Sequence, residues 1–233
     1  MKFDKAYVIG SETISKKRID NFYKKNKLKK IKINLWTAIN GSNINIESYI
    51  KDGYLTKNFK MHMPGSLGCI LSHITLWKHC IKDNNCDVAL VLEDDVILNN
   101  NFMNTLDKIS IDELPDDWEI IKLSYNKVIG KSFSKTFIKP KLNLNKGINA
   151  GSWCYLINTK NIQNVINILI PYNNKVSMDV IIRSNIDKRN IYFTKQKLAK
   201  HYDKKYSPRK DLNKPKKTLF ELIKFGFRKY FYN

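Results

Sequence analysis

The sequence predicts an α/β domain with a mainly parallel central sheet. An apolar strand at 5–9 (KAYVI), a polar helix and a second strand at 31–38 form a β-α-β unit, which is typical of parallel sheets. Residues 88–92 (VALVL) are apolar on both faces, as central parallel strands are. At 233 residues, one large domain with a small extension is the expected organisation.

The other elements follow from hydrophobic spacing. The first helix is predicted over 15–30, and residues 41–64, which show no clear period, are expected to be loop with a short helix. A strong helix is predicted over 67–81, because its apolar residues recur every three or four positions. Later segments complete the expected core: strands at 119–123 and 153–157, a helix at 161–169, and apolar pieces at 181–182 and 191–193.

The chain is strongly basic, with 42 Lys or Arg against 21 Asp or Glu and a formal net charge of +21. A solvated lysine surface is the simpler interpretation, and attraction to a nucleic acid, a nucleotide or a membrane face is the functional one. The sequence shows no recognisable RNA-binding motif, helix-turn-helix or zinc finger. We therefore expect no nucleic-acid partner.

Export and membrane signals are not evident in the sequence. No stretch approaches the ~18 consecutive apolar residues of a membrane span. Residues 1–5 place charges where a signal peptide has its apolar core. We expect a cytoplasmic protein whose four cysteines are reduced.

Three carboxylates, Glu93, Asp94 and Asp95, directly follow the apolar strand at 88–92. In open α/β sheets the carboxyl ends of the strands are where ligands bind. Like charges this close raise one another's pKa unless a cation neutralises them, and oxygen ligands suit Mg²⁺ or Mn²⁺. The triplet therefore predicts a divalent metal with positions left for substrate phosphates. The alternative is an acidic turn that caps a helix beginning near Asn99.

The helix at 67–81 carries a histidine and a cysteine that have two interpretations. Cys69 and His73 are four residues apart, like a metal-binding pair on one helix face. Neither His79 nor the cysteines at 80 and 86 complete a familiar zinc spacing. Cys69 is more simply a small buried hydrophobic residue, and a lone helical histidine is more often structural than functional.

Several of these segments resemble glycosyltransferase family 25, which contains the lipopolysaccharide and lipooligosaccharide galactosyltransferases. Residues 64–77 (PGSLGCILSHITLW) resemble the family's "GxxGCxxSHxxxW" helix, and in the family a strand ending in Glu-Asp-Asp follows, as at 89–96. Residues 36–41 resemble its "xAxxG" turn, and 151–157 its late "GxxxYLI" strand. The resemblance covers roughly residues 5–200.

Individual positions also bear on the resemblance. Asp179 follows a hydrophobic stretch where the family has an Asp, and Arg18 stands where the family has an Arg in its first helix. The departure is Val8-Ile9-Gly10-Ser11, which stands where the family's first strand usually ends in Ile-Asn-Leu. A Gly-Ser turn still offers backbone N–H groups to a nucleotide.

The resemblance implies a GT-A-like, Rossmann-like nucleotide-sugar-binding catalytic domain over residues 1–200. It implies an inverting, metal-dependent transferase that moves a hexose, most simply galactose from UDP-galactose in β linkage. The acceptor would be a cell-surface glycolipid such as lipooligosaccharide, or an oligosaccharide. Two different functions remain open from the residues alone: a nucleotidyltransferase that uses the same acidic triplet, and a basic nucleic-acid-binding protein.

The resemblance also assigns roles to residues. Asp95, with Glu93, would hold Mn²⁺ or Mg²⁺ against the leaving diphosphate of the UDP-sugar. Asp179 would deprotonate the acceptor hydroxyl, and the alternative for Asp179 is a helix N-cap. The residues expected to bind the nucleotide sugar are Gly10, Ser11, Arg18, Ser72, His73, Glu93 and Asp94.

Residues 201–233 form a basic C-terminal extension. Residues 216–232 (KKTLFELIKFGFRKYFY) predict an amphipathic helix whose aromatic-rich stripe is bordered by lysines and an arginine. Such a helix suits an anionic membrane surface, and we expect peripheral association with the inner face of the cytoplasmic membrane. The alternatives are a helix docked on the protein's own core or a dimer contact.

Overall fold

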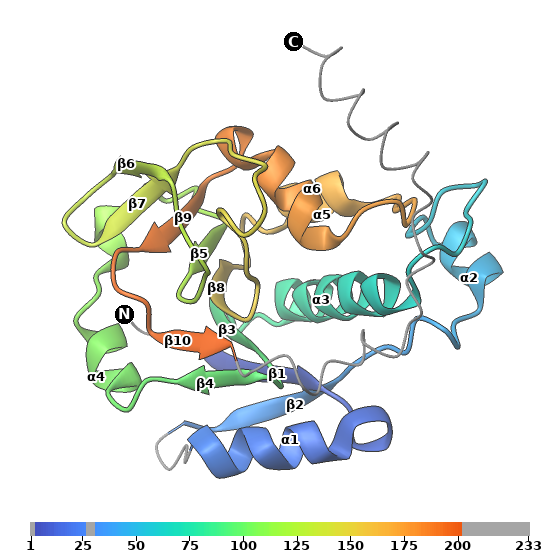
Figure 1. Cartoon of the computed structure of the whole chain (residues 1–233), viewed down its shortest axis with the longest axis horizontal. Helices are drawn as coiled ribbons and strands as arrows, with labels where there is room; N and C mark the ends of the chain where they lie inside the picture. The colour runs from blue at the N-terminus through green and yellow to red at the C-terminus, as the bar shows by residue number, and fades with distance from the viewer. Residues whose placement is uncertain (1–2, 27–30, 202–233) are drawn as a thin grey trace. The chain divides into compact units, whose positions relative to one another are not determined.

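The structure is a computed structural model, and it describes residues 3–26 and 31–201 (Figure 1). The basic extension predicted for 201–233 lies outside the described residues except for His201. The division of the chain at residue 200 and the amphipathic helix therefore stay predictions.

The β-α-β opening that the sequence predicts is confirmed. Strand β1 (Lys5–Gly10) and strand β2 (Ile33–Thr37) pair in parallel, and helix α1 (Glu12–Asn26) connects them. Strand β3 (Val88–Glu93) pairs in parallel with the other side of β1. The carboxyl ends of β1 and β3 consequently lie at the same edge of the sheet.

The rest of the sheet is mixed. Over the described part of the chain, eight strands are ordered β2-β1-β3-β8-β5-β9-β7-β6. Strand β8 runs antiparallel to both β3 and β5, whereas β5 and β9 are parallel. Antiparallel neighbours need no helical crossover, and the chain between β5 and β8 forms the β6–β7 hairpin instead. The strands beyond β3 are β5 (Ile120–Lys122), β6 (Gly130–Ser132), β7 (Phe137–Pro140), β8 (Cys154–Asn158) and β9 (Ile191–Thr194).

Helices cover both faces of the sheet, which confirms the predicted α/β class (Figure 1). Successive strand residues point to opposite faces, so Tyr7 and Val91 pack with one cluster, and Val8 and Leu92 with the other. The first face packs against α3 (Pro64–Lys82), α5 (Gln163–Leu169) and α6 (Met178–Ser184). The second packs against α1, α4 (Phe102–Asp107) and the ribbon of β4 (Val96–Leu98) and β10 (Ala199–His201). The remaining short elements are α2 (Ile46–Lys51) and the 3-10 turns η1 (Ile111–Glu113) and η2 (Ile186–Lys188).

The acidic triplet ends β3 and forms the turn into β4. The alternative that it caps a helix starting near Asn99 is wrong, because β4 intervenes and α4 begins at Phe102 with Asn101 as its N-cap. The carboxylates therefore lie at the ligand-binding edge of the sheet.

Two glycines bring helix α3 against the turn that follows β2. A Cβ at Gly68 would lie 2.3 Å from the Ile39 carbonyl oxygen, and one at Gly41 would lie 2.1 Å from the Pro64 carbonyl oxygen. The backbones can approach this closely only because neither residue has a side chain. The contact fixes where α3 starts relative to the sheet edge.

No helix among residues 3–26 and 31–201 combines the length and the apolar character needed to cross a bilayer.

We expect Gly68→Ala to destabilise the protein by about 1–3 kcal/mol, because its methyl group meets backbone atoms that no rotamer change can move. The melting temperature should fall by several degrees in a thermal unfolding experiment. Lys82→Ala, an exposed change at the end of the same helix, is the control and should shift it little. An unchanged melting temperature for Gly68→Ala would show that the turn can move away from α3.

Candidate functional site

The acidic turn, residues 93–95, is held by a guanidinium from helix α1. Arg18 Nη2 donates to Asp94 Oδ1 and, at 2.9 Å, to Asp95 Oδ2. Gly10 lies directly beside the turn, since a Cβ there would be 3.2 Å from Asp94 Cβ. The Arg18 guanidinium therefore neutralises part of the charge of the triplet, a role that the sequence predicts for a metal ion alone.

Asp94 is a structural member of the turn. It is 8% exposed, and its second oxygen accepts a hydrogen bond from Ser15 Oγ at 3.1 Å. Burial raises the pKa of the Asp94 carboxyl to about 6, although the Arg18 guanidinium beside it acts in the opposite direction. Both oxygens have protein partners, so Asp94 offers little to a ligand.

Asp95 is the member of the turn with an uncommitted oxygen. Its Oδ2 contacts Arg18 and, at 3.0 Å, Nε2 of His201 from β10. The His201 ring lies 4.7 Å from the Trp153 ring, and the bond to Asp95 raises the pKa of His201, against the effect of burial. Asp95 Oδ1 is buried and has no hydrogen-bond partner among the described residues.

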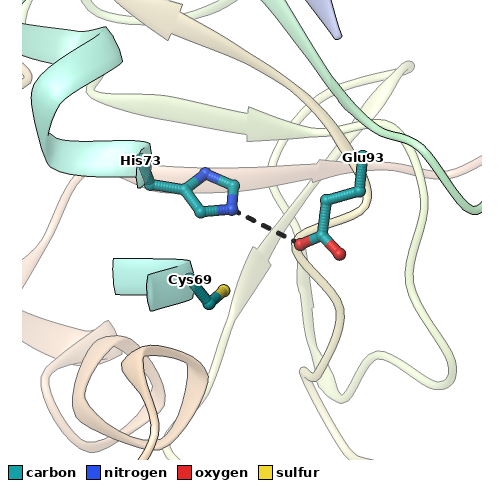
Figure 2. A group of neighbouring side chains, drawn as sticks. All are labelled: Cys69, His73 and Glu93. Atoms are coloured by element: carbon teal, nitrogen blue, oxygen red, sulfur yellow. Dashed lines mark ion pairs between the residues drawn. The ribbon is translucent and has the colours of Figure 1, made fainter. Parts of the chain in front are cut away.

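Glu93 turns toward helix α3 (Figure 2). Its Oε1 lies 3.4 Å from Nε2 of His73, whose side chain is 1% exposed. The other ring nitrogen of His73 is 2.5 Å from the hydroxyl of Tyr155 on β8. Burial lowers the pKa of His73, but contacts with Cys69 and Glu93 outweigh it and raise it to about 9. The buried His73 and the partly exposed Glu93 thus form an ion pair at the edge of the sheet.

Asp179 lies in a second charged group, the Asp179 cluster, which also contains Lys122 and Arg183. Asp179 Oδ1 accepts from the Gly151 backbone N–H at 3.1 Å and lies 3.6 Å from Lys122 Nζ. Its Oδ2 lies 3.7 Å from Arg183 Nη1, and the carboxylate is 28% exposed. The alternative that Asp179 is a helix N-cap is wrong, because Ser177 is the N-cap of α6 and Asp179 lies inside its first turn.

Lys122 is a functional candidate that the sequence reasoning missed. It ends strand β5 and is 1% exposed, and its ammonium makes no hydrogen bond within the described part of the chain. Burial lowers the pKa of Lys122, which Asp179 and Glu93 oppose through their negative charge. Lys122 thus belongs to the Asp179 cluster and lies within electrostatic reach of Glu93 in the acidic turn. The available signal was a lysine inside the apolar run at 120–123 (IIKL).

Two other residues predicted to bind the nucleotide, Ser11 and Ser72, differ in where their side chains lie. Ser11 is buried directly after β1, beside Gly10, and its hydroxyl is 3.0 Å from that of Thr13. Ser72 accepts from the Ile39 N–H at 2.8 Å and donates to the Gly68 carbonyl at 2.6 Å. The Ser72 hydroxyl is therefore committed to the contact between α3 and the turn after β2, and the structure does not bring it to the acidic turn.

Buried polar atoms without partners collect at this edge of the sheet. Most buried polar groups in proteins are hydrogen-bonded, so a group of exceptions marks a place for polar ligands or water. Over residues 3–26 and 31–201, these atoms are Arg18 Nε, Asp95 Oδ1, Lys122 Nζ, Ser152 Oγ and Arg183 Nε. Asp95 belongs to the acidic turn and Arg18 holds it. Lys122 and Arg183 belong to the Asp179 cluster, and Ser152 follows Gly151.

A divalent cation fits this arrangement. Asp95 Oδ1 is a buried, unpartnered carboxylate oxygen, and Glu93 adds a second carboxylate at the end of the same strand. Oxygen donors of this kind suit Mg²⁺ or Mn²⁺, and a few protein ligands leave positions for phosphate.

An α/β sheet with an acidic turn and a carboxylate–lysine cluster at one edge is an enzyme-like architecture. Residues 3–182 match the family model described as glycosyltransferase family 25 (LPS biosynthesis protein). The chain belongs to this family. The enzyme class expected from the sequence, a glycosyltransferase, is confirmed at the level of the family.

Individual relatives match over shorter stretches. Human procollagen galactosyltransferase 2 is 27% identical over 140 residues, which are 55% of this chain and 22% of that protein. A protein of Haemophilus influenzae described as a putative glycosyltransferase is 39% identical over 71 residues, 30% of this chain and 23% of the relative. The chain thus spans less than a quarter of the length of these relatives.

Solved structures of glycosyltransferases are similar to the chain at low identity. The galactosyltransferase LgtC, in complex with donor and acceptor sugar analogues, has a TM-score of 0.45 and 10% identity, covering 84% of this chain and 86% of LgtC. A Drosophila galactosyltransferase 7 with manganese, UDP-Gal and xylobiose has a TM-score of 0.43 and 10% identity, covering 95% of this chain and 78% of that one.

We expect Lys122→Met to stabilise the fold and to lower transfer activity. A buried ammonium without a hydrogen bond costs desolvation energy that an apolar side chain of similar size avoids, and Asp179, which loses its ion pair with Lys122, is partly exposed and keeps the Gly151 N–H and Arg183. The melting temperature should therefore rise by several degrees, while the rate of sugar transfer falls because Asp179 loses a facing cation.

Lys139→Met is the matched control, because Lys139 is partly buried but donates to the Arg189 carbonyl at 2.7 Å. This variant should not be stabilised. A lower melting temperature for Lys122→Met would show that the fold itself requires the Lys122 ammonium.

Proposed function

We propose that the protein transfers a hexose from a nucleoside diphosphate sugar to an acceptor hydroxyl, with inversion and with the help of Mn²⁺ or Mg²⁺. The observation that carries the proposal is the acidic turn of a family 25 chain, in which Asp95 Oδ1 is buried and unpartnered at the carboxyl end of β3. A divalent ion coordinated there would neutralise charge on the leaving diphosphate.

Asp95 and Glu93 would hold the ion, and Arg18 would keep the turn in place. Arg18 binds two carboxylates at once, which fixes Asp95 Oδ2 and leaves Oδ1 free. The end of β1 at Gly10 lies beside this turn, and the backbone at Gly10 and Ser11 is the proposed contact with the nucleotide.

Asp179 is the proposed base. The Gly151 N–H, Lys122 and Arg183 all face its carboxylate, and 28% of the side chain is exposed. The acceptor hydroxyl would transfer its proton to Asp179 while its oxygen bonds to the anomeric carbon. The bond from that carbon to the diphosphate breaks on the opposite side, so the configuration inverts.

The sugar and the acceptor are proposed from the relatives. The names of the human and mouse relatives support galactose, and UDP-galactose in β linkage is the donor we propose. The family description supports a glycolipid acceptor such as lipooligosaccharide, or its oligosaccharide. Meeting such an acceptor at the inner face of the cytoplasmic membrane would be the role of the basic extension, which lies outside the described residues. Family membership favours transfer over the nucleotidyltransferase and nucleic-acid-binding alternatives.

Asp95→Asn should lower the rate of transfer by at least about 100-fold, because an amide oxygen is a much poorer metal ligand than a carboxylate and the loss falls on transition-state charge. The measurement is product formation from a panel of radiolabelled UDP-sugars with Mn²⁺. EDTA should abolish the activity of the unaltered protein, and added Mn²⁺ should restore it.

The control is Asp87→Asn, which changes a carboxylate that is 67% exposed and pairs with Lys160. It should leave transfer unchanged. A rate for Asp95→Asn close to that of the unaltered protein would overturn the assignment of Asp95.

Asp179→Asn should reduce turnover strongly while the affinity for the nucleotide sugar stays nearly unchanged, because the base acts on the acceptor. The amide oxygen can still accept from the Gly151 N–H, so the fold should persist. Turnover is measured by transfer kinetics and donor affinity by calorimetry.

Asp187→Asn serves as the control for an aspartate with only a structural contact, since Asp187 Oδ1 accepts from the Leu142 N–H at 2.7 Å. It should not lower turnover. Loss of donor binding, or of several degrees of melting temperature, in Asp179→Asn would assign Asp179 a structural role instead.

A further inference from the structure

Helix α3 and strand β3 bring together a cysteine, a histidine and a glutamate (Figure 2). Cys69 and His73 are four residues apart and share one face of α3, and Glu93 reaches this face from the end of β3. One ligand atom from each residue lies within 4.8 Å of those of the other two. Among residues 3–26 and 31–201, no other three His, Cys, Asp or Glu residues meet in this way.

The histidine is oriented as a metal ligand is. The Trp77 indole N–H donates to the Tyr155 hydroxyl oxygen at 3.0 Å, and Nδ1 of His73 lies 2.5 Å from the same oxygen. This outer contact fixes the ring with Nε2 facing Glu93 at 3.4 Å. Metal-binding histidines are typically held through their second nitrogen in this manner.

The ion pair between His73 and Glu93 does not account for Cys69. The other three cysteines, Cys80, Cys86 and Cys154, are buried, as small hydrophobic residues are, whereas Cys69 is partly exposed. Its sulfur lies within 4.8 Å of ligand atoms of His73 and Glu93, while the residue also packs against the hydrophobic cluster on this face of the sheet. A cation that accepts sulfur, nitrogen and oxygen ligands together would explain why a polarisable sulfur lies beside this histidine and glutamate.

We propose that Cys69, His73 and Glu93 bind Zn²⁺. Thiolate, imidazole and carboxylate are the ligands that zinc takes in proteins, whereas Mg²⁺ and Mn²⁺ prefer oxygen alone. Three protein ligands leave a fourth position, as in zinc sites that bind water or substrate. Cys69 and Glu93 are partly exposed, which gives the ion a path of entry.

This zinc site shares Glu93 with the ion proposed at the acidic turn and differs from it in its other ligands. Asp95 is not part of the group formed by Cys69, His73 and Glu93. Zinc binding therefore does not depend on the proposed transferase function, and it can be measured without any sugar substrate.

The test is metal binding by the full chain. The protein is stripped with EDTA and titrated with Co²⁺, whose bond to a thiolate gives a near-ultraviolet charge-transfer band, and Zn²⁺ affinity is measured by competition with a chromophoric chelator. We expect one Zn²⁺ per chain and a cobalt–thiolate band. Cys69→Ser should abolish the band and weaken Zn²⁺ binding by more than about 100-fold. Tyr155→Phe removes only the hydroxyl that orients His73 and should weaken Zn²⁺ binding less, by roughly 10–100-fold.

Two controls separate this proposal from the others. Cys86→Ser removes a buried cysteine elsewhere and should keep the band, which excludes general loss of thiols. Asp95→Asn should keep the band even where it abolishes transfer, so failure of the transferase proposal leaves this one testable. Absence of the band in the unaltered protein, or unchanged Zn²⁺ affinity in Cys69→Ser, would overturn the zinc site.

Discussion

The contact of Arg18 with Asp94 and Asp95 is the interaction on which the site depends. Consecutive carboxylates at the end of a buried strand repel one another and lose hydration, so they need compensating charge. A guanidinium can bind two carboxylates with fixed geometry, which a lysine cannot do. With Arg18 in place, the chain can turn tightly from β3 into β4. Strand β4 pairs with β10, and this pairing places His201 of β10 in contact with Asp95.

Strand β8 joins the two charged groups of the site. It lies between β3 and β5, so Glu93 and Lys122 flank it at the same edge of the sheet. Its Tyr155 hydroxyl orients His73, and the Gly151 N–H just before it binds Asp179. An antiparallel strand at this point places its own first residues beside the last residues of its neighbours, which a parallel strand would not do.

The arrangement costs stability where it is chemically useful. A buried ammonium and a buried carboxylate oxygen without hydrogen bonds each oppose folding, and both lie at the edge of the sheet where ligands bind in α/β folds. The two hydrophobic clusters on either side of the sheet supply the stability that allows this. The site is thus built on strands, on α1, α3 and α6, and on the short turns beside them.

The sequence alone determined the α/β class, the order of the first strands and helices, the acidic triplet at the end of β3 and the family. These features depend on the spacing of apolar residues, which covalent geometry links to strands and helices, and on local motifs. The tertiary structure decided which side chains meet: Lys122 with Asp179, Glu93 with Cys69 and His73, Ser72 with a backbone N–H. Such contacts depend on strand order, direction and register, which long-range packing sets and local spacing does not encode.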